Sequence, residues 1–173
     1  MKKIILSIIA IFILTMGVSA QQRYGFVDTK YILSKMPDYT NAQMQLDKLS
    51  EKWQKEIEEI AMKIREMQAK FRADEVFLSP EMREQREKAI HEKEVMVQKL
   101  QQRYFGQNGE LYKKRQELVK PIQDDIYEVI KKVAKSGNYG MIIDKANEPT
   151  VIYSSPKFDL SDKVLYRLGI RTK

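Results

Sequence analysis

The chain has 173 residues, a formal net charge of +7, 32% charged residues, seven glycines and no cysteine. The absence of cysteine excludes disulfides and thiolate chemistry, and many charges with few glycines argue against one large globular core. The excess positive charge is spread thinly along the chain, so the concentrated basic surface that nucleic-acid binding needs is not expected.

The first twenty residues are typical of an export signal. Lys2 and Lys3 precede an apolar run over 4–16, and Val18-Ser19-Ala20 supplies the small residues of a cleavage site after Ala20. An uncleaved membrane anchor is the alternative, but the apolar run is shorter than the roughly 20 residues that span a bilayer. We therefore expect an exported, cleaved and soluble protein.

A short strand and a short helix are expected next. Tyr24-Gly25-Phe26-Val27 has strand composition. Asp28 is placed to cap a helix over 29–35, which Pro37 ends. Asp38 is predicted to cap the long helix that follows.

The stretch from Asp38 to about Leu118, which we call the prong, is predicted to form two antiparallel helices, each roughly 55–60 Å long. Its apolar residues recur three and four apart in the first half and every seventh residue in the second, as in a coiled coil. The predicted seam consists of Leu46, Leu49, Trp53, Ile57, Ile60, Ile64, Met67 and Phe71, then Ile90, Val97, Tyr104, Leu111 and Leu118. Ser79 should cap the returning helix and Pro80 should begin it.

Three residues are predicted to act as a hinge in the returning half. Gly106 and Gly109 each cost about 1 kcal/mol relative to Ala in a helix interior, so we expect a soft point in a continuing helix. Pro121 removes a helix hydrogen bond and is expected to force a kink or a restart.

The remaining residues are predicted to complete a small strand-containing body. Gly137 should end a helix, after which 139–143 and 151–154 are expected to form a hairpin. Asp159 or Ser161 is then placed to cap a last helix. Three short strands are marginal alone, and their open edges favour pairing with other copies, which a closed barrel of strands would complete.

The predicted fold is therefore α+β, with a long helical coiled-coil hairpin inserted into a small β-strand body that oligomerises. The expected parts are a signal peptide over 1–20, a body over 21–37 and 119–173, and the prong over 38–118. Contacts between copies are expected at Tyr24, Phe26, Ile142, Val151 and Tyr153.

Nothing in the sequence points to catalysis or to a cofactor. His91 lies in a charged helical stretch without cysteine or a second histidine to share a metal. Asp124 and Asp125 are more typical of a solvated helix turn than of a paired-carboxylate site. Phosphate-binding loops and nucleophile motifs do not occur. We predict that the protein is not an enzyme and needs no cofactor or metal.

Three parts of the sequence resemble the Skp/OmpH family of periplasmic chaperones. They are Tyr24 to Pro37, Glu117-Leu118-Val119-Lys120-Pro121-Ile122 with its continuation to Gly140, and Asp159 to Leu165. The resemblance implies a periplasmic homotrimer whose strands form a barrel-like body and whose hairpins project as tentacles around a cavity. It also implies that unfolded outer membrane proteins are held there without ATP.

A holdase of this kind needs adaptable apolar contacts, which methionine supplies. The expected client contacts are prong residues at the tip or off the simplest seam, namely Met62, Phe77, Leu78, Met82 and Met96. The basic pI also favours weak contact with anionic membrane lipid. The alternative function is an exported coiled-coil adaptor that binds one folded partner, which patterning alone does not exclude.

Overall fold

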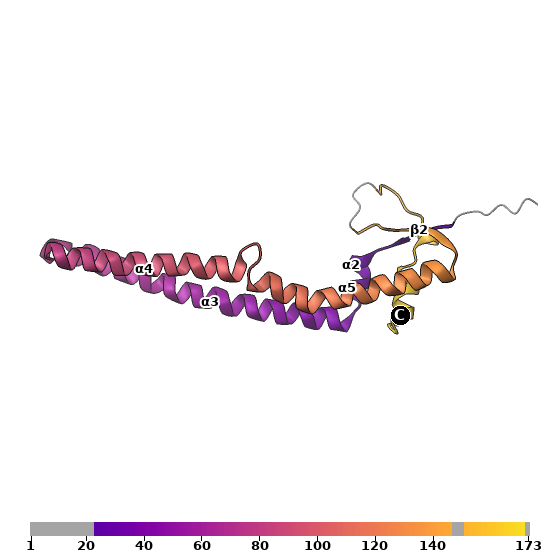
Figure 1. Ribbon diagram of the computed structural model, residues 1–173, viewed down its shortest axis with the longest axis horizontal. Coiled ribbons are helices and arrows are strands. Elements are labelled where there is room, and N and C mark those ends of the chain that lie inside the picture. The colour runs from indigo at the N-terminus through magenta and orange to yellow at the C-terminus, as the bar shows by residue number, and fades with distance from the viewer. Residues whose placement is uncertain (1–22, 147–150, 172–173) are drawn as a thin grey trace, which may run out of the picture.

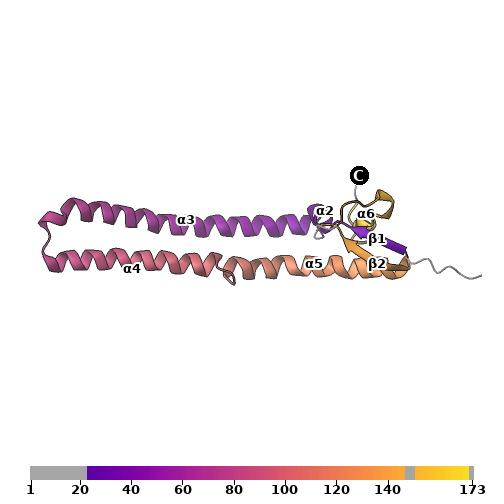
Figure 2. The same cartoon turned by 90° about the horizontal axis from the view of Figure 1, so that it is seen from above.

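The computed structural model describes residues 23–146 and 151–171, so the predicted signal peptide lies outside the described residues. The elements in chain order are β1 (Arg23–Val27), α2 (Thr29–Ser34), α3 (Pro37–Asp74), η1 (Glu75–Phe77), α4 (Pro80–Phe105), α5 (Glu110–Ser136), β2 (Tyr139–Asp144), η2 (Pro156–Phe158) and α6 (Ser161–Arg167). Figures 1 and 2 show α3 lying beside α4 and α5 along a thin hairpin, with the other elements gathered at one end. The predicted helical hairpin and small body are confirmed.

The predicted seam joins the two sides of the prong. Leu46 and Ile64 of α3 and Ile90 and Tyr104 of α4 are buried, and the other predicted seam residues are half-buried. Each helix has one neighbour along most of its length in this chain, so a single apolar stripe is covered and the remaining faces stay charged.

Two of the predicted helix caps are present. Asp28 Oδ1 accepts a hydrogen bond of 2.9 Å from the Tyr31 amide at the start of α2, and Ser79 Oγ accepts one of 3.2 Å from the Met82 amide at the start of α4. The prediction for Asp38 is wrong. Pro37 occupies the first position of α3, so Asp38 lies inside the first turn, where its charge complements the helix dipole.

The returning side contains a complete break instead of a soft point. The helix stops at Phe105, Gly106 and Gly109 flank a turn, and α5 begins at Glu110. Pro121, in contrast, lies inside α5 without a restart. Pro121 is exposed, so water can bond the carbonyl that lacks a helix donor, while Val119 and Ile126 on the buried side keep the helix packed.

The body contains a parallel pair of strands, not the predicted hairpin. β1 pairs with β2 in parallel, with Phe26 opposite Ile143, and the whole prong forms the long connection that a parallel pair requires. Residues 151–154 form no strand in the described chain. Instead the segment before α6 approaches β1, and the Leu160 amide donates a hydrogen bond of 2.7 Å to the Phe26 carbonyl. That backbone contact uses the edge of β1 that a third strand would otherwise occupy.

The core of the body is built from both ends of the chain and from α5. Its buried members are Val27, Ile32, Met36, Ile126, Val133, Leu160, Val164 and Leu165. A second cluster of Ala42, Leu46 and Val119 lies where the prong meets the body. α5 runs as one helix through the predicted boundary between 118 and 119, and it therefore contributes residues to both clusters.

The end of α5 and the start of α6 differ slightly from the prediction. Gly137 does end α5, but the left-handed residue is Asn138, with a φ of 52°. Leu160 is the N-cap residue of α6 and offers no side-chain bond. Asp159 instead accepts a hydrogen bond of 2.9 Å from the amide of Ser161, so neither predicted residue is the cap.

Candidate functional site

The tip of the prong exposes apolar side chains. Val76 and Phe77 in η1 are 82% and 85% exposed, and Leu78 is half-buried. The turn is fixed by Arg83, whose guanidinium donates a hydrogen bond of 3.1 Å to the Glu75 carbonyl. The turn therefore presents Val76 and Phe77 to solvent. Val76 was not among the predicted contacts, although it directly precedes Phe77.

Three predicted methionine contacts lie along the sides of the prong. Met62 on α3 is 51% exposed, and Met82 and Met96 on α4 are each 48% exposed. Met67 is half-buried in the seam, as its register predicts. Met44, which was not singled out, has the same exposure as Met82. The long flexible side chains thus lie at several heights on an otherwise charged surface.

An aromatic cluster fixes the two sides of the prong near its middle. The rings of Trp53 and Tyr104 stack with centroids 4.7 Å apart and planes within 5°, and Phe105 meets Trp53 edge-on. The Tyr104 hydroxyl donates a hydrogen bond of 3.1 Å to Glu56. Burial, together with the Glu56 carboxylate, raises the pKa of Tyr104. This cluster sets the register between α3 and α4 immediately before the turn that separates α4 from α5.

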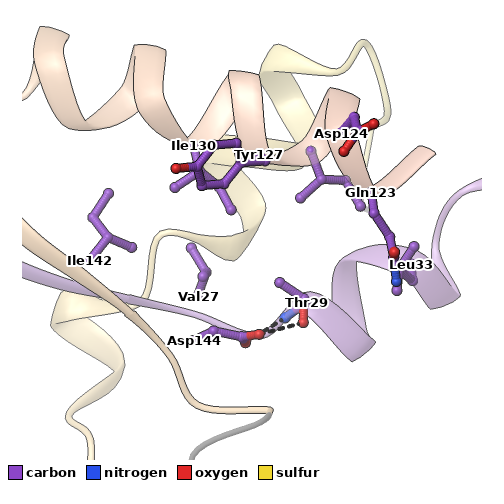
Figure 3. A pocket seen from close by; sticks show the side chains of 10 residues that line it. Val27, Thr29, Leu33, Gln123, Asp124, Tyr127, Ile130, Ile142 and Asp144 are labelled. Carbon is purple, nitrogen blue, oxygen red and sulfur yellow. Dashed lines mark hydrogen bonds between the residues drawn. The ribbon is translucent and has the colours of Figure 1, made fainter. Parts of the chain in front are cut away.

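A hollow of about 430 Å³ lies between α5 and the strands. Figure 3 shows Ile142 and Val27 on one side and Tyr127 and Ile130 on the other. Tyr127 is 60% exposed, and the sequence reasoning did not identify it. Its lining is mostly apolar and also includes Asp124 and Asp144.

The residues predicted to join copies have different environments in the single chain. Ile142 lines the hollow, and Phe26 and Val151 are half-buried. Tyr153 is 80% exposed, and Ile152, which was missed, is 98% exposed. Ile152 lies in the run that was predicted to form a strand. The sequence therefore indicated that this run pairs with another copy, but not which of its side chains would be exposed.

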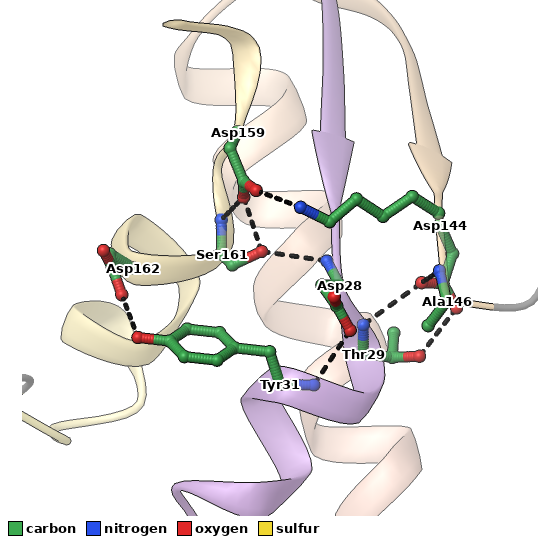
Figure 4. Close-up of polar contacts among 9 residues, drawn as sticks. Asp28, Thr29, Tyr31, Asp144, Ala146, Asp159, Ser161 and Asp162 are labelled. Carbon is green, nitrogen blue, oxygen red and sulfur yellow. Dashed lines mark hydrogen bonds and ion pairs between the residues drawn. The ribbon is translucent and has the colours of Figure 1, made fainter. Parts of the chain in front are cut away.

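A polar network ties the last segment of the chain to the first. Figure 4 shows Ser161 between Asp159 and Asp28. The Ser161 hydroxyl accepts a bond of 2.8 Å from the Asp28 amide and donates one of 2.6 Å to Asp159. Lys145 forms an ion pair of 2.6 Å with Asp159. Burial opposes the charge of Asp159, but the hydrogen bonds from Lys145 and Ser161 lower its pKa overall. The hydrogen bond to Asp159 raises the pKa of Lys145.

A second polar contact holds α6 against α2. The Tyr31 hydroxyl donates a hydrogen bond of 3.0 Å to Asp162, and this bond to the carboxylate raises the pKa of Tyr31. Thr29 likewise donates to Asp144 from both its amide, at 3.1 Å, and its hydroxyl, at 2.7 Å. These bonds lie within the body and fix α2 relative to β2 and α6.

The residues considered for catalysis are placed as ordinary surface residues. The His91 side chain is 75% exposed and lies 3.9 Å from Glu94. Asp124 forms an ion pair of 2.8 Å with Lys120 one turn away. Within 23–146 and 151–171, no group of three or more His, Asp or Glu side chains is arranged to hold a metal ion. Over the same residues, no helix has the length and apolarity needed to cross a membrane.

Comparison with known proteins places the chain in a family. The profile of the family described as "Outer membrane protein (OmpH-like)" matches residues 23–168, whereas a search of curated proteins gave no match. The fold resembles that of an OmpH-like protein from Caulobacter crescentus described as a candidate outer membrane chaperone, with 13% identity and a TM-score of 0.67. That likeness covers 86% of this chain and 85% of the other. Since the family profile spans most of the sequence, the protein belongs to the OmpH-like family.

Proposed function

We propose that this protein is an ATP-independent holdase chaperone of the periplasm that binds unfolded outer membrane proteins and prevents their aggregation. One observation carries the proposal: Val76 and Phe77 are more than four-fifths exposed at the end of a long charged prong. Membership of the OmpH-like family supports a chaperone role, and the predicted export signal supports the location.

The physical requirements of a client explain why such a surface is useful. An unfolded barrel protein exposes alternating apolar side chains and free strand edges, which pair readily with other chains. A holdase has to offer several weak, adaptable contacts, and preferential binding of the unfolded state needs no nucleotide. The tip residues and the exposed Met62, Met82 and Met96 provide contacts of this kind at different heights.

Oligomerisation completes the proposal. Three copies joined through their bodies would direct three prongs around one cavity. Ile152 and Tyr153 are the most exposed apolar residues of the body, and an apolar segment of this kind favours burial against another copy. The hollow that Ile142 lines offers a further apolar surface in the body. The basic net charge also favours weak contact with anionic membrane lipid.

The proposal is tested with a urea-denatured outer membrane β-barrel protein diluted into buffer, whose light scattering is followed with and without the mature chain. An equimolar amount of trimer should suppress the scattering, and Val76→Ser with Phe77→Ser should weaken the suppression several-fold. Glu84→Ser is the matched control, because Glu84 is exposed on the first turns of α4 but polar. A folded-partner adaptor would leave the scattering unchanged, and that result would contradict the holdase function.

A further inference from the structure

The loop that separates α4 from α5 shortens the returning side of the prong. Tyr104 lies level with Trp53 and Glu56 of α3, as their ring stack and hydrogen bond show. Val119 comes fifteen residues later, so in a continuous helix it would lie level with 38–41. It packs instead in one cluster with Ala42 and Leu46. About one helical turn of the returning chain is therefore looped out.

The contacts of Gly109 agree with this shortening. A Cβ atom on Gly109 would lie 2.8 Å from the carbonyl oxygens of both Arg103 and Tyr104. In a continuous helix, residue 109 would be about 7.5 Å beyond Tyr104 along the axis. The start of α5 thus lies against the last carbonyls of α4, and Figure 1 shows the intervening loop projecting from the hairpin.

The loop itself is a compact turn, and little keeps it from becoming helical. The Gly109 amide donates a hydrogen bond of 2.9 Å to the Gly106 carbonyl, which closes a β-turn around Gln107 and Asn108. Glycine is the least favourable residue in a helix apart from proline. The two glycines therefore disfavour the alternative in which 106–109 become helical and join α4 to α5.

We propose that the 106–109 loop is a conformational switch that bends the prong by refolding into one added turn of helix. The added turn would lengthen the returning side by about 5.4 Å. Near the tip the sides are tied by the Arg86–Asp74 ion pair of 2.7 Å, and at the base by the cluster around Val119. Because both ends are tied, the extra length bends the prong toward α3.

The size of the bend follows from helix geometry. A length difference of about 5.4 Å between helices whose axes are about 9 Å apart corresponds to a bend of about 30°. The part of α3 from Trp53 to Asp74 is about 32 Å long, so its end would move by about 15 Å. For the proposed holdase, this movement would change the width of the space between prongs. The switch itself does not depend on that function.

Two variants favour opposite states. Gly106→Ala with Gly109→Ala raises helix propensity, by about 30-fold in the equilibrium from the two residues together. While the loop is formed, both added methyl groups would crowd backbone oxygens at the end of α4. Gln107→Pro favours the loop. Proline suits the second position of a β-turn, prevents a continuous helix, and follows Gly106, whose ψ of 168° is already extended.

The experiment measures the distance between spin labels at Lys99→Cys and Lys113→Cys, two exposed positions that flank the loop in a chain without native cysteine. The double alanine variant should lengthen this distance by about 5 Å and protect the amides of Gln107 and Asn108 from hydrogen exchange. Gln107→Pro should keep the short distance. An unchanged distance in the alanine variant, or loss of helix in α4, would overturn the proposal. Because no client is added, the result stands whether or not holdase activity is found.

Discussion

The aromatic cluster at Trp53 provides a direct test of how the two sides of the prong are held together. Tyr104 is 8% exposed, stacks on Trp53 and bonds Glu56. Truncation of a buried aromatic side chain costs about 3–5 kcal/mol in a protein core. The prong is only two helices thick, so neighbouring side chains can close part of the gap, and we expect about 3 kcal/mol for Tyr104→Ala.

Two variants separate the parts of this free energy. Tyr104→Phe keeps the ring stack and removes only the hydrogen bond to Glu56, which should cost about 1 kcal/mol. The remaining loss of about 2 kcal/mol in Tyr104→Ala is the burial and stacking of the ring, since an aromatic pair contributes about 0.5–1.5 kcal/mol beyond its buried area.

The assay is urea unfolding at one fixed protein concentration, because oligomerisation makes stability depend on concentration. Trp53 is the single tryptophan of the chain, so its fluorescence reports the prong, while circular dichroism reports all helices. The urea midpoint should decrease in the order wild type, Tyr104→Phe, Tyr104→Ala. Equal midpoints for the wild type and Tyr104→Ala would refute the conclusion that this stack holds the prong together.

Three further predictions concern the body. Asp159→Asn should lower the free energy of unfolding by about 1–2 kcal/mol at pH 7, because it removes the negative charge of the carboxylate to which Lys145 and Ser161 donate hydrogen bonds. Since the pKa of Asp159 is lowered from 3.8, the stability it provides is fully present above about pH 4 and is lost as the pH falls through the lowered value. The pKa of Lys145 is raised from 10.5, so its contribution is present below that value and lost at higher pH. The difference in urea midpoint between variant and wild type should thus be constant from pH 5 to 9 and should shrink as the pH falls below 3.8; a difference that does not shrink in acid would contradict this account. Ile152→Asp with Tyr153→Asp should dissociate the proposed oligomer without unfolding the chain, because both side chains are at least 80% exposed; an unchanged mass in sedimentation would exclude them from the interface, and Lys157→Asp is the exposed control. Asn138→Val should cost about 1–2 kcal/mol in thermal unfolding, because a β-branched residue is strained at a φ of 52°, whereas Asn138→Gly should be nearly neutral; equal losses from both variants would rule out backbone strain as the cause.

The sequence by itself determined the features that arise from near neighbours along the chain. The three- and four-residue spacing from Leu46 to Phe71 specifies a helix with one apolar stripe, whatever it packs against. Caps such as Asp28 and Ser79 act within three residues, so both were identified. The candidate client contacts at Phe77 and Met82 followed from the same reasoning, because the turn between the helices was predictable.

The tertiary structure decided the features that depend on distant segments. β2 pairs with β1 across the whole prong, although residues 151–154 are close in sequence and equally suited to strand pairing. Leu160 then bonds the free edge of β1, a contact that local propensity does not encode. Pro121 stays inside a helix because the packing of residues before and after it in the sequence outweighs one lost hydrogen bond. Local patterns fix which face of an element is apolar, and only long-range packing fixes which partner covers that face.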